Sequence, residues 1–162
     1  MPGQEIGPVA KRIVQDGKIY TVGRMGHLCC LDAAKGDVLW QKKLEEDYGF
    51  KFAPGAPSPL IDSGLLILFV GGKKQASCIV ALHKDTGKEA WKALDDSLTF
   101  SSPIVVTAAG KKQLIVWTEQ SVASLDPATG AIWWQQPLLT SSEVVPRLLH
   151  AAGHARHGAR HA

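Results

Sequence analysis

Short apolar runs separated by polar turn residues extend along most of this chain. β-branched and aromatic residues fill the runs, and Gly, Lys, Asp or Ser stands between one run and the next. Runs of this length with such boundaries are typical of β-strands. They form three groups of four: residues 9–14, 18–22, 28–31 and 38–42; residues 59–62, 65–70, 78–82 and 88–93; and residues 102–107, 113–118, 121–125 and 131–135. The pattern therefore predicts an all-β chain built from three antiparallel four-stranded units.

A ten-residue phrase joins the last two runs of every unit. It reads LDAAKGDVLW at residues 31–40, LHKDTGKEAW at residues 82–91 and LDPATGAIWW at residues 125–134. The glycines of successive copies are 51 and 43 residues apart. Self-similarity at this period in a strand-rich chain indicates the blades of a β-propeller. We therefore expect a partial β-propeller of about three blades, followed by an irregular or weakly helical C-terminal tail.

The residues of the phrase have expected structural roles. A short acidic side chain accepts hydrogen bonds from turn amides, and glycine supplies the positive φ that a hairpin bulge needs. The tryptophan returns to the sheet as a broad plate suited to packing on a neighbouring sheet. The repeat residues are Asp32, Gly36, Trp40, Thr86, Gly87, Trp91, Asp126, Thr129, Gly130 and Trp134.

Working outward from the phrases predicts blades at about residues 8–44, 54–95 and 100–138, within one propeller segment at residues 1–138. Three blades do not close a ring, because propellers usually contain about four to eight. The chain is then either a piece of a longer propeller or a unit whose open blade faces meet another copy. We favour the piece, because the first run begins within a few residues of Met1.

Residues 139–162 form a low-complexity tail that we expect to be disordered. Its histidines have spacings of 4, 3 and 4, which on a helix would create a stripe for zinc or nickel: His150, His154, His157 and His161. Glycine and proline residues weaken any helix in this stretch. A disordered or out-of-frame terminus is therefore favoured over a metal site.

The longer form of the phrase, Ala-x-Asp-x-x-Thr-Gly-x-x-x-Trp, resembles the tryptophan-docking motif of PQQ-binding-like β-propeller repeat proteins. That group includes quinoprotein alcohol dehydrogenases and the propeller lipoprotein of the bacterial outer-membrane assembly machinery. This chain departs from the motif at Cys30, Lys35, His83 and Ser124. The resemblance covers about residues 8–138 and implies the fold, but one fold hosts many activities.

The adjacent pair Cys29 and Cys30 is the most tempting catalytic feature, since quinoprotein alcohol dehydrogenases have two adjacent cysteines beside their cofactor. Neighbouring residues in a strand face opposite sides of the sheet, so one thiol should be buried and the other should point away. Cysteine is commonly buried as a small hydrophobe. We therefore favour a packing role for this pair over a cofactor role.

PQQ catalysis also needs oxygen ligands that converge on a hard cation, together with a catalytic base. The acidic residues are instead expected in turns or exposed linkers: Asp16, Asp32, Asp62, Asp126, Glu45, Glu46, Asp47, Asp95 and Asp96. We therefore expect no catalytic or cofactor-binding residue in this segment. PQQ with calcium belongs only to the alternative, in which the chain is part of a quinoprotein dehydrogenase whose cofactor site lies on missing blades.

Charge and hydropathy limit the partners and the location. Three arginines in residues 144–162 equal the whole formal net charge of +3, so the rest of the chain is balanced, which argues against a nucleic-acid partner. No apolar run approaches the ~20 residues of a membrane-spanning helix, and no signal-peptide pattern starts the chain. The residues alone are compatible with the cytoplasm, whereas the resemblance implies the periplasm or cell surface.

The function that these features favour is a non-catalytic binding or scaffolding module. Its partners would be another protein, the remaining propeller blades, or a second copy that associates through open blade faces. The dehydrogenase alternative leaves the question of enzymatic activity open.

Overall fold

Three four-stranded antiparallel sheets, which we call blades 1, 2 and 3, make up this computed structural model. The structure describes residues 11–23, 25–49, 57–71, 78–97, 99 and 101–138. Blade 1 contains β1 (Lys11–Gln15), β2 (Lys18–Val22), β3 (His27–Asp32) and β4 (Val38–Lys43). Blade 2 contains β5 (Leu60–Asp62), β6 (Leu65–Phe69), β7 (Ile79–His83) and β8 (Glu89–Ala93). Blade 3 contains β9 (Ile104–Ala108), β10 (Lys111–Trp117), β11 (Ser121–Leu125) and β12 (Ile132–Pro137).

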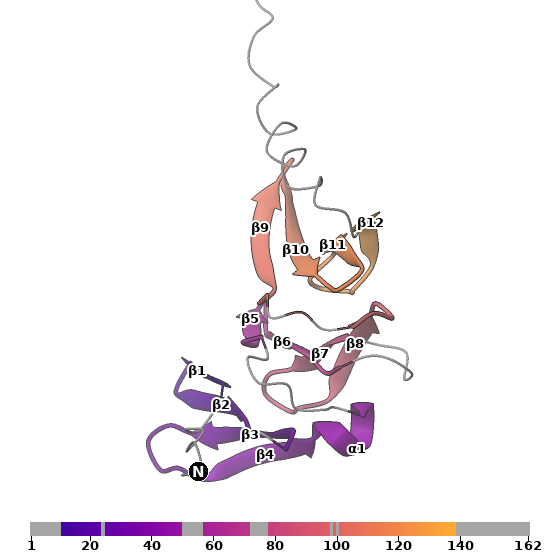
Figure 1. Cartoon of the computed structure of the whole chain (residues 1–162). Helices are drawn as coiled ribbons and strands as arrows, with labels where there is room; N and C mark the ends of the chain where they lie inside the picture. The colour runs from indigo at the N-terminus through magenta and orange to yellow at the C-terminus, as the bar shows by residue number, and fades with distance from the viewer. Residues whose placement is uncertain are drawn as a thin grey trace, which may run out of the picture.

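The predicted fold class is confirmed. Within each blade the strands pair in chain order, and the three blades follow one another as an open row with blade 2 in the middle (Figure 1). A one-residue irregularity interrupts the pairing of the last two strands in all three blades, immediately before the tryptophan of the repeated phrase: the extra residue is Leu39, Ala90 or Trp133. The repeat seen in the sequence is therefore one supersecondary unit used three times.

Tight turns join the first two strands of each blade. Asp16 and Gly17 occupy the turn of blade 1 with φ of 50° and 70°, and the corresponding pair in blade 3, Ala109 and Gly110, has φ of 51° and 73°. Two consecutive residues with positive φ match the right-handed twist of the strands that they connect. These turns fix the register of the first hairpin in each blade.

The hydrophobic core lies on both faces of blade 2. Leu66 and Leu68 face a cluster that includes residues of blade 1, whereas Ile67 and Phe69 face a cluster that includes residues of blade 3. All five residues of β6 are buried as a result. This explains why β6 is a continuous apolar run, while a strand with only one covered face alternates between apolar and polar residues.

A short helix, α1 (Leu44–Tyr48), follows blade 1 and was not predicted. Leu44 is buried, and the ring of Tyr48 packs against the cluster between blades 1 and 2. The Tyr48 hydroxyl donates a hydrogen bond to the carboxylate of Glu89 in blade 2 at 2.7 Å. One helical turn is too short to produce a recognisable period in the sequence, and the helix ends at Gly49 with φ of 64°.

The tail predicted at residues 139–162, with its four histidines, lies outside the described residues. The boundary at residue 138 and the character of the tail therefore stay predictions. Within the part of the chain that the structure describes, no helix is long and apolar enough to cross a membrane.

Tyr20 carries a testable consequence of the packing between blades 1 and 2. Its side chain is fully buried, and among the described residues its hydroxyl has no hydrogen-bond partner. Burial, with a smaller contribution from Cys30, raises the pKa of Tyr20 to about 12 from 10.0. The folded state therefore keeps this phenol neutral at alkaline pH, where the unfolded chain ionises it.

We expect Tyr20→Phe to change the free energy of unfolding by less than about 1 kcal/mol near neutral pH, because no hydrogen bond is lost. Between about pH 10 and pH 12 the parent protein should lose stability faster than the variant, since only the parent can ionise this phenol on unfolding. Urea unfolding at a series of pH values measures both effects. Equal pH dependence in the two proteins would contradict the burial of this hydroxyl.

Candidate functional site

The tryptophan of blade 1 lies on the repeated turn of blade 2. An indole N–H of Trp40 donates a hydrogen bond to the carbonyl of Lys84 at 3.0 Å. The indole ring covers Gly87 so closely that an added Cβ there would lie 2.7 Å from Cε3 of Trp40. The ring also packs against the cluster that contains Tyr20, and the centroids of the Trp40 and Tyr20 rings lie 6.2 Å apart.

Blade 2 repeats this contact with blade 3. The indole N–H of Trp91 donates to the carbonyl of Pro127 at 3.1 Å, and a Cβ added to Gly130 would lie 2.6 Å from Cε3 of the ring. Trp91 is only 7% exposed. Each tryptophan thus contacts the turn of the next copy in chain order, and we call this arrangement the indole-on-turn contact.

Glycine has two functions in the repeated turn, and the sequence analysis found only one of them. The φ angles of Gly36, Gly87 and Gly130 are 77°, 69° and 74°, so each residue adopts the predicted left-handed conformation in the turn. The bulge itself lies three residues later, immediately before the tryptophan. At Gly87 and Gly130 the missing side chain also provides the surface on which an indole lies. Every copy of the phrase contains both glycine and tryptophan, but the sequence of one copy does not indicate that its tryptophan contacts the glycine of the next copy.

The acidic residue of the phrase stabilises the turn itself. Asp32 Oδ1 accepts hydrogen bonds from the amides of Ala34 and Lys35 at 2.9 and 2.8 Å. Asp126 Oδ1 accepts one from the amide of Ala128 at 2.8 Å. These carboxylates are therefore engaged within their own turns.

Ion pairs accompany the indole-on-turn contact between blades 1 and 2. Lys84, beside the contact, binds Asp16 at 3.0 Å, and Asp85 accepts a hydrogen bond from Lys18 at 2.6 Å. The hydrogen bond to Asp16 raises the pKa of Lys84, and the hydrogen bond from Lys18 lowers the pKa of Asp85. Both pairs are solvent-exposed on at least one side, so they contribute more to alignment than to stability.

The face of blade 3 turned away from blade 2 has no partner among the described residues. We call it the outer face of blade 3, and cross-strand pairing places Ile115, Ser124 and Trp134 on it, together with Trp117 and Val122. Trp134 is 41% exposed and Trp117 is 43% exposed, in contrast to Trp91. An apolar surface of this kind marks an interaction site in many proteins.

The opposite end of the row has a second unpartnered surface, the outer face of blade 1. Thr21, Cys29 and Gln41 are paired across the sheet on this face, and Ile19 and Leu31 lie beside them. Its turn is also open, because nothing among the described residues lies within 4 Å of a Cβ placed on Gly36. Across residues 11–138, as far as the structure describes them, the row has an exposed tryptophan on the outer face of blade 3 and an open glycine turn on blade 1.

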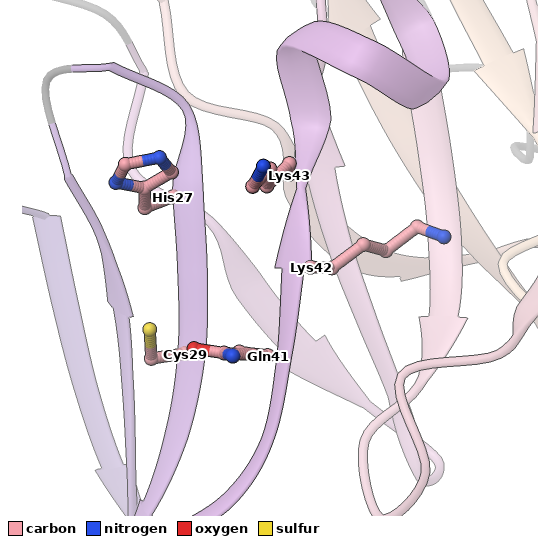
Figure 2. Close-up of a pocket in the computed structure, with 5 residues that line it drawn as sticks. All are labelled: His27, Cys29, Gln41, Lys42 and Lys43. Atoms are coloured by element: carbon pink, nitrogen blue, oxygen red, sulfur yellow. The ribbon is translucent and has the colours of Figure 1, made fainter.

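A pocket of about 410 Å³ lies on this outer face of blade 1 and is lined by His27, Cys29, Gln41, Lys42 and Lys43. Figure 2 shows Cys29 level with Gln41 on the adjacent strands and His27 level with Lys43, while Lys42 extends away from the other four. The blade 2 residue that corresponds to Cys29 is Val80, which is fully buried. The pocket therefore exists where a neighbouring blade covers the equivalent position in blade 2.

The two adjacent cysteines face opposite sides of β3, as strand alternation predicts. Cys30 is fully buried beside Tyr20, and burial raises its thiol pKa. Cys29 is half-buried and lines the pocket. Cys78 is buried, which raises its pKa to about 12, and all three thiols are free. The buried thiols are poor nucleophiles, because reactivity requires the thiolate.

Asp96 corrects one expectation, since the sequence analysis placed it in an exposed linker. Its side chain is 6% exposed, and its carboxylate accepts hydrogen bonds from the Thr118 hydroxyl and from the amides of Ser97 and Gln120. Ser121 completes the cluster at 3.5 Å. Nothing local distinguishes Asp96 from Asp95, because Thr118, Gln120 and Ser121 lie more than twenty residues away along the chain. The carboxylate holds the linker against blade 3 and borders a second pocket of about 320 Å³.

The donor groups do not fit a metal–quinone centre. Among the described residues, no three His, Cys, Asp or Glu side chains lie together in a way that could hold a metal ion. The carboxylates that approach other groups contact turn amides, the Asp96 cluster, lysines or the Tyr48 hydroxyl; Asp62, for example, lies 2.9 Å from Lys112. No catalytic step through PQQ or calcium can be derived from these residues.

These features define the class of the protein. Four-stranded blades with a repeated turn, in which the indoles of blades 1 and 2 lie on the turn of the following blade, are those of a PQQ-like β-propeller repeat protein. The family model described as outer membrane protein assembly factor BamB matches residues 5–148, so the chain belongs to that family. A sequence comparison with curated proteins found no match.

Solved structures share the fold. BamB from Moraxella catarrhalis is 20% identical with a TM-score of 0.53, over 78% of this chain and 35% of its own. A europium-containing methanol dehydrogenase is 19% identical with a TM-score of 0.57, over 82% and 25% of the two chains. Quinohemoprotein alcohol dehydrogenase from Comamonas testosteroni is 18% identical with a TM-score of 0.55, over 77% and 26%. The chain thus spans between a quarter and about a third of the length of these proteins.

The two tryptophan environments lead to a direct test of stability. Trp91→Ala should lower the free energy of unfolding by about 3–5 kcal/mol, because it removes a buried indole from the junction of two blades. Trp134→Ala is the matched control and should cost less than about 1 kcal/mol in dilute protein, because its indole is exposed. Denaturant unfolding measures both changes. Similar losses in the two variants would contradict the unequal packing of these side chains.

The three glycines separate backbone strain from the indole contact. Gly36→Ala should lower the free energy of unfolding by about 1–2 kcal/mol, since the only unfavourable effect is alanine in the left-handed conformation. Alanine at Gly130 has the same strain and also meets the ring of Trp91, so it should cost a further ~1–3 kcal/mol. Gly87→Ala should behave like Gly130→Ala. Equal unfolding free energies for all three variants would show that the ring does not rest on the glycine.

Proposed function

We propose that this chain is a segment of a non-catalytic β-propeller that acts as a protein-binding or scaffolding module. The observation that carries the proposal is the pair of outer blade faces that have no partner among the described residues; that of blade 3 exposes Trp134 and Trp117. Exposed apolar surface on a rigid sheet suits a protein partner or further propeller blades. Membership of the outer membrane protein assembly factor family supports a role in assembling other proteins.

The same membership supports a location outside the cytoplasm, in the periplasm. A β-sheet scaffold is well suited to binding other proteins, because its strands keep the binding residues in fixed positions without the need for a cofactor. Several carboxylates engage turn amides, lysines or the Asp96 cluster, and the exposed indoles of blade 3 offer a surface for recognition.

One observation favours a second candidate, in which the chain is part of a PQQ-dependent quinoprotein dehydrogenase. The thiol of Cys29 lines a pocket and is adjacent in sequence to Cys30, and two of the similar structures are alcohol or methanol dehydrogenases. The cofactor site would then lie mainly on blades outside this chain. The two candidates make opposite predictions about cofactor binding.

We expect no saturable change in tryptophan fluorescence when micromolar PQQ and calcium are added to the protein, because the described residues do not assemble a cation site. N-acetyltryptophanamide titrated in parallel corrects for absorption of light by PQQ. A Cys29→Ser variant serves as the second control, since it removes the pocket thiol alone. Saturable quenching in the parent that is weakened in this variant would contradict the scaffold proposal and support the dehydrogenase.

A further inference from the structure

The open turn of blade 1 has the same geometry as the two turns that already hold an indole. The amide of Gly36 donates to the carbonyl of Asp32 at 2.8 Å, as Gly87 does to His83 and Gly130 does to Asp126 at the same distance. The φ of Gly36 is 77°, within 8° of the other two glycines. The carbonyl of Ala33 corresponds in the repeat to the carbonyls that accept the indole hydrogen bonds in blades 2 and 3. Blade 1 therefore presents a preformed acceptor for an indole.

Blade 3 presents the matching donor. Trp134 occupies the position of Trp40 and Trp91 in the repeated phrase, but its ring is 41% exposed. It is paired with Ser124 across the sheet, as Trp91 is with Ala81 and Trp40 is with Cys30. The backbone that aims the two engaged indoles at the following blade thus aims Trp134 away from blade 2, on the outer face of blade 3.

The residues around the two open ends are also compatible in charge. In the junction of blades 1 and 2, Lys84 pairs with Asp16. The repeat places Ala33 at the position of Lys84 and Ala109 at the position of Asp16. If the two open ends met, two small uncharged residues would face each other where an ion pair stands inside the chain. The other ion pair of that junction, Lys18 with Asp85, would be replaced by Lys111 facing Ala34. No two like charges would meet at either point, which permits the encounter.

We propose that the outer face of blade 3 binds the outer face of blade 1 in a second copy of this chain, with Trp134 over Gly36 and its indole N–H donating to the carbonyl of Ala33. The contact is the indole-on-turn contact made between molecules. The second copy would then be a partner of the proposed binding module, so this inference rests on the proposed scaffold function. Because the two surfaces are different, the association is head-to-tail and produces either a closed ring or a longer row.

Sedimentation velocity over roughly a hundredfold range of protein concentration tests the proposal. The parent should change from monomer to larger species as its concentration rises. Trp134→Ala removes the donor and should stay monomeric. Gly36→Asn should also stay monomeric, because asparagine tolerates the left-handed conformation while its side chain occupies the place of the indole. Trp133→Ala is the control: this neighbouring indole is exposed and lies near the ammonium of Lys111 instead, so its loss should leave association unchanged.

Mixing the two blocked variants gives the sharpest result. Trp134→Ala keeps an intact acceptor and Gly36→Asn keeps an intact donor, so together they can form one junction and no more. An equimolar mixture should therefore contain a one-to-one dimer and nothing larger. Circular dichroism and melting curves of each variant show that it is folded before the comparison.

A parent that is monomeric at every concentration would overturn the proposal, as would association of Trp134→Ala equal to that of the parent, or a mixture that contains only monomers. These outcomes leave the scaffold function intact, since a different protein could then occupy the same faces. Saturable PQQ binding would instead overturn the scaffold function and would be seen whatever the oligomeric state. The two failures are therefore distinguishable.

Discussion

The contact between an indole and a glycine turn links local backbone geometry to the packing of whole sheets. The glycine that permits the left-handed turn has no side chain, and at Gly87 and Gly130 the tryptophan of the preceding blade covers it. A hydrogen bond from the indole N–H to a turn carbonyl then fixes the ring in orientation. Because one short phrase encodes both halves of the contact, each copy recognises the next. The row of blades follows from this single interaction, repeated.

Blade 2 shows what this interaction achieves when both neighbours are present. Both faces of β6 are covered, and Leu66 and Ile67 on its opposite sides are fully buried. The outer faces of blades 1 and 3 consist of the same kinds of sheet, yet they retain half-buried or exposed apolar side chains such as Cys29 and Trp134. Burial in the end blade 3 is uneven, since all five residues of β11 are buried whereas all six of β12 are exposed.

The repeated phrase was sufficient to predict the blades, because turn chemistry and strand alternation are local and recur three times. The strand ranges, the left-handed conformation of Gly36 and its counterparts, and the opposite orientations of the two adjacent cysteines all depend on neighbouring residues. What could not be predicted depends on residues far apart in the chain. The burial of Asp96 requires Thr118, and helix α1 exists because Leu44 and Tyr48 find apolar surface between two blades. Long-range packing overrode the local signal in both places.

The charged pairs beside the two internal junctions differ, and this difference bears on how the chain finds its correct order. Lys84 and Asp16 mark one junction, whereas Lys112 and Asp62 mark the other at a different place on the sheet. Repeats with identical edges could dock in the wrong sequence during folding and become trapped as misassembled arrays. A blade docked in the wrong order would lose its ion pair, so the two different pairs disfavour the wrong order. A feature that adds little to the stability of the finished protein can therefore raise the fidelity with which it is made.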